Sequence, residues 1–315
     1  MTKELPKLSV TDLISANDLP TGDILAIFDT AARLKKTPKA YAKALDGKRL
    51  AMMFEKESLR TRMTFDVGIQ DLGGSAVFMD QSDVRLGTRE AIKDVAKNLE
   101  RWMDGLVLRT YKHKTVQEFA EHGSIPVING LTDYMHPCQA LSDTFTLLEK
   151  WGTLKGRTLA YVGDGNNTCH SLIHVAAKLG MNMRVASPEG YEPNSRIVNE
   201  AMNTALETKS KITILNSPQD AVQDVDVVYT DVWASMGQEH ETEERAETFS
   251  PYQVNEDLMA LAKKDALFLH CLPAHRGAEV TAGVIDSPCS IVYDNAENRY
   301  HIQKAVMLLL MAERD

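Results

Sequence analysis

Short apolar runs alternate with longer amphipathic segments along almost the whole chain. The apolar runs predict strands at 49–54, 75–79, 105–109, 125–128, 158–162, 182–186, 211–215, 226–230, 266–270 and 290–293. Between the runs, apolar residues recur at helical spacing, which predicts helices at 22–35, 59–72, 89–101, 115–122, 137–150, 168–179, 194–207, 255–263 and 296–311. Strands that alternate with helices in this way are typical of an α/β fold with parallel sheets.

Two similar stretches suggest that the chain repeats one plan twice. Gly47–Ala51 and Gly156–Ala160 each lead through a strand to a polar loop and then to a helix. The pattern predicts two domains, 1–148 and 149–295, each with a central, mostly parallel sheet flanked by helices. The last helix is strongly apolar on one side and must pack on something, so we expect 296–315 to cross back to the first domain.

The composition narrows the class of protein. A chain of 315 residues with 43% hydrophobic content can bury a large core or two domains. A net charge of −9 argues against nucleic-acid and membrane-surface partners. The four cysteines show no CxxC pairing, the N-terminus lacks an apolar signal region, and no apolar run approaches the ~20 residues that span a bilayer. We therefore expect a cytoplasmic enzyme.

The segment Ser58-Leu59-Arg60-Thr61-Arg62 joins a predicted strand to a predicted helix. Ser58 is a suitable N-cap, so the side chains of Arg60, Thr61 and Arg62 cluster where free backbone N–H groups point outward. The guanidinium fork matches phosphate oxygens, and a helix N-terminus favours an anion. The segment predicts a site for a phosphate dianion; the alternative is an ordinary capped helix with surface arginines.

A second candidate lies at the start of another predicted helix, in His136-Pro137-Cys138-Gln139. Pro137 suits the first helical position, which puts His136 and Gln139 at the helix N-terminus. A histidine can donate to a developing oxyanion, and a glutamine can bind an amide-like NH2 group. His136 could equally be a simple cap. Arg109, at the end of strand 105–109, is a further anion clamp or else a solvated charge.

The glycine-rich segment Gly163–Asn167 also follows a predicted strand and opens a helix. It resembles a dinucleotide fingerprint, but Thr168 stands where the third glycine belongs. The next strand also ends without the acidic residue that would bind a ribose. The asparagine pair Asn166-Asn167 is better suited to the carboxylate or amine of a polar substrate.

Asp231 follows the apolar strand 226–230 and could pair with a substrate ammonium group. The loop that follows, as far as Pro251, is rich in Glu and in small residues and suggests a mobile lid. For its distal part, Glu239–Glu247, a solvated acidic loop is the preferred interpretation.

The segment His270–Gly277 contains two histidines and a cysteine after a predicted strand. Their spacing matches no usual zinc pattern, so no metal ligand set is predicted. Cys271 is more plausible as a polar contact to substrate; a covalent cysteine with His275 as its base ranks second. Arg299, near the start of the last helix, could return toward the same region.

Taken together, these segments resemble the aspartate/ornithine carbamoyltransferase family over nearly the whole chain. The residues that carry the resemblance are 54–62, 129–139, 163–167, 231–239, 270–273 and 296–299. Ser235-Met236-Gly237 is similar to the loop of the ornithine-type members. The resemblance implies transfer of the carbamoyl group from carbamoyl phosphate to the δ-amine of L-ornithine, giving L-citrulline and phosphate, in arginine biosynthesis or a urea-cycle-type step. The alternative is a carbamoyltransferase for another amine, such as an N-acylated ornithine or putrescine.

The resemblance also implies a role for each candidate residue. The phosphate would be held by Ser58, Leu59, Arg60, Thr61 and Arg109. The carbonyl oxygen would be polarised by His136, with Arg109 and Thr61. The carbamoyl NH2 would be held by Gln139 and the backbone carbonyls of Cys271 and Leu272, with Arg299 nearby. Ornithine would be bound by Asn167, Asp231, Ser235 and Met236, and its attacking amine oriented by Asp231 and Cys271.

Two positions depart from the family pattern. Leu59 stands where the family usually has Thr, and Arg85 stands where ornithine-type members usually have Gln or His. Arg85 lies in a loop that, in the family, reaches the active site of a neighbouring subunit. An arginine there would add a contact to the phosphate or alter the choice of acceptor; the alternative is a solvated loop arginine. The resemblance implies a homotrimer with shared active sites, no metal and no organic cofactor.

Overall fold

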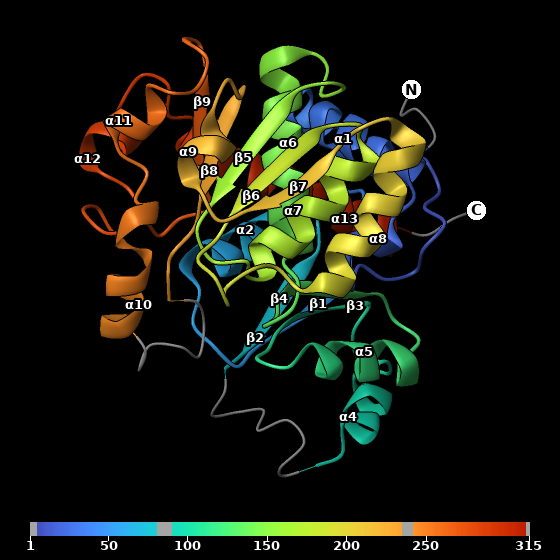
Figure 1. Cartoon of the computed structure of the whole chain (residues 1–315). Helices are drawn as coiled ribbons and strands as arrows, with labels where there is room; N and C mark the ends of the chain where they lie inside the picture. The colour runs from blue at the N-terminus through green and yellow to red at the C-terminus, as the bar shows by residue number, and fades with distance from the viewer. Residues whose placement is uncertain (1–4, 81–89, 235–241, 313–315) are drawn as a thin grey trace. The chain divides into compact units, whose positions relative to one another are not determined.

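The computed structural model describes residues 5–80, 90–234 and 242–312 (Figure 1). Its strands are β1 (Arg49–Phe54), β2 (Ser75–Met79), β3 (Gly105–Arg109), β4 (Val127–Leu131), β5 (Thr158–Val162), β6 (Asn182–Ala186), β7 (Ile212–Leu215), β8 (Val227–Thr230) and β9 (Leu267–His270). Its α-helices are α1 (Thr21–Lys36), α2 (Leu59–Asp71), α4 (Ile92–Leu99), α5 (His113–His122), α6 (Pro137–Trp151), α7 (Asn167–Lys178), α8 (Ser195–Thr208), α9 (Pro218–Val222), α10 (Thr242–Phe249), α11 (Glu256–Met259), α12 (Ala282–Ile285) and α13 (Val292–Met311). The predicted alternation of strands and helices is confirmed. No helix in these ranges is long and apolar enough to cross a membrane.

The chain divides into two compact units. Unit 1 combines residues 1–141 with 298–315, and unit 2 comprises residues 142–297. The divisions therefore fall inside two helices, α6 and α13. Each unit has its own parallel sheet, as the sequence predicted.

The sheet of unit 1 has the strand order β2-β1-β3-β4, and all of its pairs are parallel. The chain runs outward from β1 to β2 and then returns to the other side of β1 as β3, so the order reverses between β1 and β3. The register aligns Phe54 with Arg109 and Arg109 with Leu131. The segments that follow β1, β3 and β4 therefore begin at one edge, and a reversal of this kind is where open α/β sheets bind ligands.

The end of α13 packs within unit 1. A Cβ atom on Gly68 of α2 would lie 3.0 Å from side-chain atoms of Lys304 and Met307, so glycine allows the two helices to approach closely. A Cβ atom on Gly105, at the start of β3, would lie 2.8 Å from the sulfur of Met311. The last helix thus crosses back to the first unit, as its apolar side predicted. Helices α4 and α5 contribute to an apolar core with β1, β3 and β4.

The sheet of unit 2 has the order β7-β6-β5-β8-β9, again parallel throughout. Here the order reverses between β5 and β8. The register aligns Val162 with Thr230 and Thr230 with His270, so the segments that follow β5, β8 and β9 begin at one edge. Helices α7 and α8 pack side by side (Figure 1). Residues from α9, α11 and α12 join an apolar core with β5, β8 and β9.

Two of the predicted elements differ in the structure. The strand predicted at 290–293 is wrong: Ser290 forms a single bridge with Phe268, and α13 begins at Val292. A short apolar run cannot be distinguished from the first turn of a buried helix by periodicity alone. The helix predicted at 255–263 is only one turn, Glu256–Met259, capped by the side chain of Asn255.

Candidate active site

In unit 1, the segment after β1 folds as the sequence predicted. Ser58 is the N-cap of α2, and its Oγ accepts a hydrogen bond from the backbone N–H of Thr61 at 3.2 Å. The side chains of Arg60 and Arg62 lie on different faces of α2, because residues two apart on a helix do not face the same way. Arg60 is half-buried, whereas Arg62 is exposed and its guanidinium lies over the ring of Phe78 at 3.7 Å. Arg60 is therefore the better candidate for a buried anion.

A pocket of about 760 Å³ lies beside the start of α2, on the side of Arg62. Its lining includes four carboxylate side chains, from Glu55, Glu57, Asp66 and Asp80. A cluster of carboxylates repels a phosphate dianion at the distances of a binding pocket. We therefore do not assign the phosphate to this pocket, although Ser58 and Leu59 also line it.

A buried arginine links three helices of unit 1. Arg299 of α13 is only 5% exposed. Its Nη2 donates to the Thr61 hydroxyl of α2 at 3.0 Å, and its Nη1 donates to Oε1 of Gln139 in the first turn of α6. The structure thus brings together three residues that lie far apart in the sequence.

His136 precedes α6, whose first residue is Pro137 as predicted. Its imidazole is buried, and burial is the largest cause that lowers the pKa of His136 well below its ordinary value. The positive charges of Arg299 and Arg109 lower this pKa further. His136 is therefore neutral at physiological pH, and one of its ring nitrogens can donate to an oxygen that gains negative charge. We call Thr61, Arg109, His136, Gln139 and Arg299 the anion cluster.

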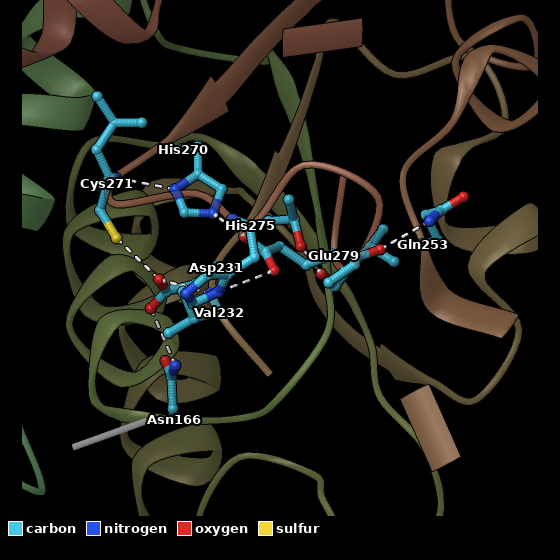
Figure 2. Close-up of polar contacts among 12 residues, drawn as sticks. Asn166, Asp231, Val232, Gln253, His270, Cys271, His275 and Glu279 are labelled. Carbon is cyan, nitrogen blue, oxygen red and sulfur yellow. Dashed lines mark hydrogen bonds and ion pairs between the residues drawn. The ribbon is translucent and has the colours of Figure 1, made fainter. Parts of the chain in front are cut away.

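In unit 2, Asp231 directly follows β8 and is buried. Its carboxylate accepts hydrogen bonds from the Val232 N–H at 2.8 Å, from Nδ2 of Asn166 at 3.0 Å and from the thiol of Cys271 at 2.9 Å (Figure 2). Three donors on one carboxylate fix its orientation. We call Asn166, Asp231 and Cys271 the acid cluster.

Asn166 was predicted as part of a polar loop, and its contact with Asp231 was not. It is the N-cap of α7: its Oδ1 accepts from the N–H groups of Thr168 and Cys169, and Tyr161 donates to the same oxygen. The amide thus uses its oxygen for the helix and its NH2 for Asp231. The available signal was an asparagine two residues before the predicted helix 168–179, because asparagine is a common N-cap.

The same contacts exclude the dinucleotide interpretation of this loop. That interpretation requires free N–H groups at the start of α7, and two of them donate to Asn166 instead. Gly165 is explained by packing, because a Cβ atom there would lie 2.1 Å from the backbone nitrogen of Pro193. Asn167, a predicted ornithine contact, is buried, and its side chain accepts from the N–H of Thr168 at 2.8 Å.

The segment after β9 has an unusual backbone. Leu272 has a φ of +59°, in the left-handed region that costs a residue with a side chain about 1–2 kcal/mol. Its N–H donates to Nδ1 of the buried His270 at 2.8 Å. Strained residues of this kind are often found at functional sites, where neighbouring contacts hold them. The adjacent residue, Cys271, is the one that donates to Asp231.

The thiol of Cys271 donates a hydrogen bond to Asp231. This argues against Cys271 as a covalent nucleophile, which must be a thiolate. His275, the base proposed for that alternative, has a side chain that is 67% exposed and lies beside Glu279. The structure therefore supports a contact role for Cys271.

Ligand atoms of Asp231, His270 and Cys271 lie within 4.8 Å of one another and could in principle hold a metal ion. Two hydrogen bonds within the protein already engage these side chains. Nδ1 of His270 accepts from Leu272, and the thiol of Cys271 donates to Asp231. A metal ion bound there would have to replace these contacts.

The segment before Pro251 is partly helical. Residues 242–249 form α10, so the solvated acidic loop predicted for 239–247 is wrong where it falls in the described part of the chain. Arg245 is buried and donates to Asp164 at 3.0 Å and to the Trp233 carbonyl at 2.9 Å. A buried ion pair of this kind holds the helix to the loop after β5. Arg85, Ser235 and Met236 lie outside the described residues.

Both halves of the chain are similar to domains of one known family. Residues 11–149 match the carbamoyl-P binding domain of aspartate/ornithine carbamoyltransferase, and residues 155–310 match its Asp/Orn binding domain.

Individual relatives match over almost their full length. An ornithine carbamoyltransferase of Pyrococcus horikoshii is 50% identical over 303 residues, which is 95% of each chain. One of Pyrococcus furiosus, described as anabolic, is 50% identical over 307 residues, or 96% of this chain and 97% of that protein. The solved ornithine carbamoyltransferase structure from Pyrococcus furiosus has a TM-score of 0.93 at 50% identity and covers 95% of this chain and 96% of its own.

Proposed function

Because the chain belongs to the aspartate/ornithine carbamoyltransferase family, we propose that it transfers the carbamoyl group from carbamoyl phosphate to the δ-amine of L-ornithine. The products are L-citrulline and phosphate. The observation that carries this proposal is the anion cluster, in which the buried Arg299 joins Thr61 and Gln139 beside a neutral His136. The name of the Pyrococcus furiosus relative supports the biosynthetic direction.

Carbamoyl phosphate would bind to unit 1. The residues assigned to its phosphate are Ser58, Leu59, Arg60, Thr61, Arg109 and, from the loop outside the described residues, Arg85. Arg60 and Arg109 supply charge at the ends of α2 and β3, where a phosphate also gains from the N-terminus of the helix. The carbonyl oxygen would receive hydrogen bonds from His136, Arg109 and Thr61. The carbamoyl NH2 would be held by Gln139, with Arg299 nearby.

The amino acid would bind to unit 2. Asp231 offers a fixed carboxylate that can accept from an ammonium group or an amine, and Cys271 donates to it. Asn167 and, outside the described residues, Ser235 and Met236 are assigned to the amino-acid end of ornithine. The carbonyls of Cys271 and Leu272 are assigned to the carbamoyl NH2.

The reaction needs a neutral amine, although an alkyl amine resembles lysine and has a pKa of about 10.4. The amine nitrogen attacks the carbonyl carbon, and a tetrahedral intermediate forms with charge on its oxygen. Donors that already surround this oxygen stabilise it without reorganisation. The bond from carbon to the phosphate oxygen then breaks, and the departing phosphate accepts the proton that the nitrogen loses. No separate protein base is required.

We also propose that the chain forms a homotrimer with shared active sites. The outer side of α2 carries an exposed apolar stripe with helical spacing, formed by Leu59, Met63 and Val67, which are 74%, 50% and 40% exposed. Val77, on the edge strand β2, is also exposed. Contiguous exposed apolar residues favour an interface between subunits. Light scattering should give three times the 35.0 kDa of one chain; a mass of one chain would contradict the trimer.

The four cysteines are free thiols, which suits a reducing compartment, and we place the enzyme in the cytoplasm. Targeting of the full-length protein in cells tests this assignment, and its export would contradict it.

The experiment that tests the function compares acceptors side by side. Formation of the ureido product and release of phosphate are measured with ornithine, N-acetylornithine, N-succinylornithine, putrescine and aspartate. We expect ornithine to give a kcat/KM at least about 100-fold above the others, because a site built around one charged group rejects analogues that leave it unpaired. Preference for another amine would change the assigned acceptor, and a rate of phosphate release that no acceptor increases would contradict carbamoyl transfer.

A further inference from the structure

A buried acid–histidine pair lies behind the segment after β9. His270 is 0% exposed and Glu279 is 1% exposed. Nε2 of His270 lies 3.3 Å from Oε1 of Glu279 (Figure 2). Charged side chains are almost never buried this completely unless they have a specific partner. Neither residue is among those assigned to a substrate.

The contacts of His270 determine which of its nitrogens carries the proton. Nδ1 accepts a hydrogen bond from the N–H of Leu272 at 2.8 Å, so Nδ1 cannot itself be protonated. The remaining proton of the neutral ring must be on Nε2, which faces the carboxylate of Glu279. A carboxylate at this position stabilises that tautomer and the orientation of the ring, as the outer partner of a functional histidine commonly does.

Glu279 is itself held in place. Its Oε1 accepts from the backbone N–H of His275 at 2.5 Å, and its backbone carbonyl accepts from Val254 at 2.9 Å. The loop closes further because Gly277 donates to the carbonyl of Val280, at 2.8 Å. His275 also approaches Oε2 of Glu279 through Nδ1, at 3.6 Å, but its side chain is largely exposed. The carboxylate thus has one buried histidine and one exposed histidine beside it.

We propose that Glu279 is a positioning residue for carbamoyl transfer, acting through His270 on the peptide of Cys271 and Leu272. The carboxylate holds the Nε2–H tautomer of His270, and the free Nδ1 of that tautomer fixes the N–H of Leu272. This contact orients the carbonyls of Cys271 and Leu272, and with them the thiol that donates to Asp231. The inference rests on the proposed function, which assigns those carbonyls to the carbamoyl NH2.

The test begins with the wild-type enzyme, assayed for citrulline with carbamoyl phosphate and ornithine. Absence of citrulline there would refute the proposed function and not the role of Glu279. Given activity, Glu279→Gln keeps the size of the side chain and an oxygen for the His275 N–H, but removes the charge. We expect its kcat to fall about 10- to 100-fold, by analogy with the loss found when the carboxylate that orients a metal-binding histidine is removed. Glu279→Asp, which withdraws the carboxylate from Nε2, provides a second variant if the first does not fold.

The matched control is His275→Gln, which alters the exposed histidine on the same carboxylate and leaves the backbone contact intact. We expect its kcat to stay within about twofold of wild type. If His275→Gln lost as much activity as Glu279→Gln, the carboxylate would act through His275 and not through His270. That result would overturn the proposal.

A double-mutant cycle separates positioning from general stability. In His270→Asn, the asparagine oxygen can replace Nδ1 as the acceptor for Leu272, but no ring remains for Glu279 to orient. If Glu279 acts through His270, adding Glu279→Gln to this variant should change kcat by less than about twofold. The same loss in both backgrounds, or a Glu279→Gln enzyme with wild-type kcat, would refute the proposal.

Discussion

The anion cluster of unit 1 and the acid cluster of unit 2 occupy the same place in two similar sheets. Each lies at the carboxyl ends of parallel strands, beside the point where the strand order reverses. Their chemistry is opposite. Unit 1 gathers donors and positive charge around Arg299 and His136, whereas unit 2 surrounds a single acceptor, Asp231, with donors.

The difference originates in how each helix start is used. At the start of α2, the hydroxyl of Ser58 accepts from the N–H of Thr61, and Arg60, two residues after Ser58, adds a positive charge. At the start of α7, the side-chain oxygen of Asn166 accepts from two backbone N–H groups, and its NH2 donates to Asp231. The fold therefore provides the same position twice, and the capping residue and its neighbours decide whether an anion or a cation is favoured there.

The largest expected effect comes from removing a positively charged side chain from the proposed phosphate site. Arg60→Ala should lower kcat/KM for carbamoyl phosphate by about 10²- to 10³-fold, because the loss of one preorganised donor to a charged group typically has an effect of this size. Initial rates of phosphate release measure the change.

Its matched control is Arg62→Ala, two residues further along the same helix. The guanidinium of Arg62 lies over Phe78, so we expect a change of only a few-fold. Equal losses of kcat/KM in the two variants would show that Arg60 and Arg62 contribute alike to phosphate binding. That result would contradict the assignment of the phosphate to Arg60.

The second prediction concerns the acid cluster. Asp231→Asn should raise the KM for ornithine by about 100-fold, with a smaller change in the KM for carbamoyl phosphate, because it removes the charge that meets the amine. Steady-state kinetics with each substrate varied in turn provide the measurement. Equal increases in both constants would argue against a specific role with the acceptor.

Asp226→Asn is the control for this substitution, since Asp226 precedes the other end of the same strand. Its carboxylate pairs with Arg157 and Lys263, which are partly exposed, so we expect a loss of about 1–2 kcal/mol of stability and no change in KM. Burial alone would raise the pKa of Asp226, but the contacts with Lys263, the Thr158 N–H and Arg157 lower it. The difference in stability should therefore persist down to about pH 4 and disappear as the pH falls through the lowered pKa.

The smallest effect concerns the protonation of His136. Because burial and then Arg299 and Arg109 lower its pKa in the folded state, the unfolded chain binds this proton first. The contribution to stability is complete above about pH 6.5 and is lost as the pH falls toward the lowered pKa. Unfolding in urea between pH 5 and 7 should show less pH dependence in His136→Asn than in wild type. Identical slopes would mean that His136 titrates normally.

Much of the fold could be predicted from local patterns. Apolar runs located the strands of both sheets, and Ser58 and Pro137 marked the starts of α2 and α6 because their chemistry is local. Asp231 was identifiable because an acid at the end of a buried strand lies at the binding edge of a sheet.

Long-range pairing could not be predicted in the same way. Arg299 contacts Thr61 and Gln139 across more than half of the chain, and nothing in the spacing of these residues shows it. Arg245 was assigned to a solvated acidic loop because its neighbours are acidic, whereas its partner Asp164 lies after another strand. Glu279 was missed because its role depends on a tautomer of His270, which only the contacts of that ring reveal.

The most direct test of the account is a crossed kinetic comparison of Arg60→Lys and Asp231→Asn. Lysine keeps the positive charge at position 60 but lacks the planar guanidinium that can bind two phosphate oxygens at once. Because the charge is kept, activity should remain measurable. Citrulline formation is followed while each substrate is varied at saturating levels of the other. We predict that Arg60→Lys raises the KM for carbamoyl phosphate and that Asp231→Asn raises the KM for ornithine. In each variant this increase should be at least about tenfold larger than the increase in the KM for the other substrate. If either variant changed both KM values equally, the assignment of carbamoyl phosphate to unit 1 and of ornithine to unit 2 would be wrong.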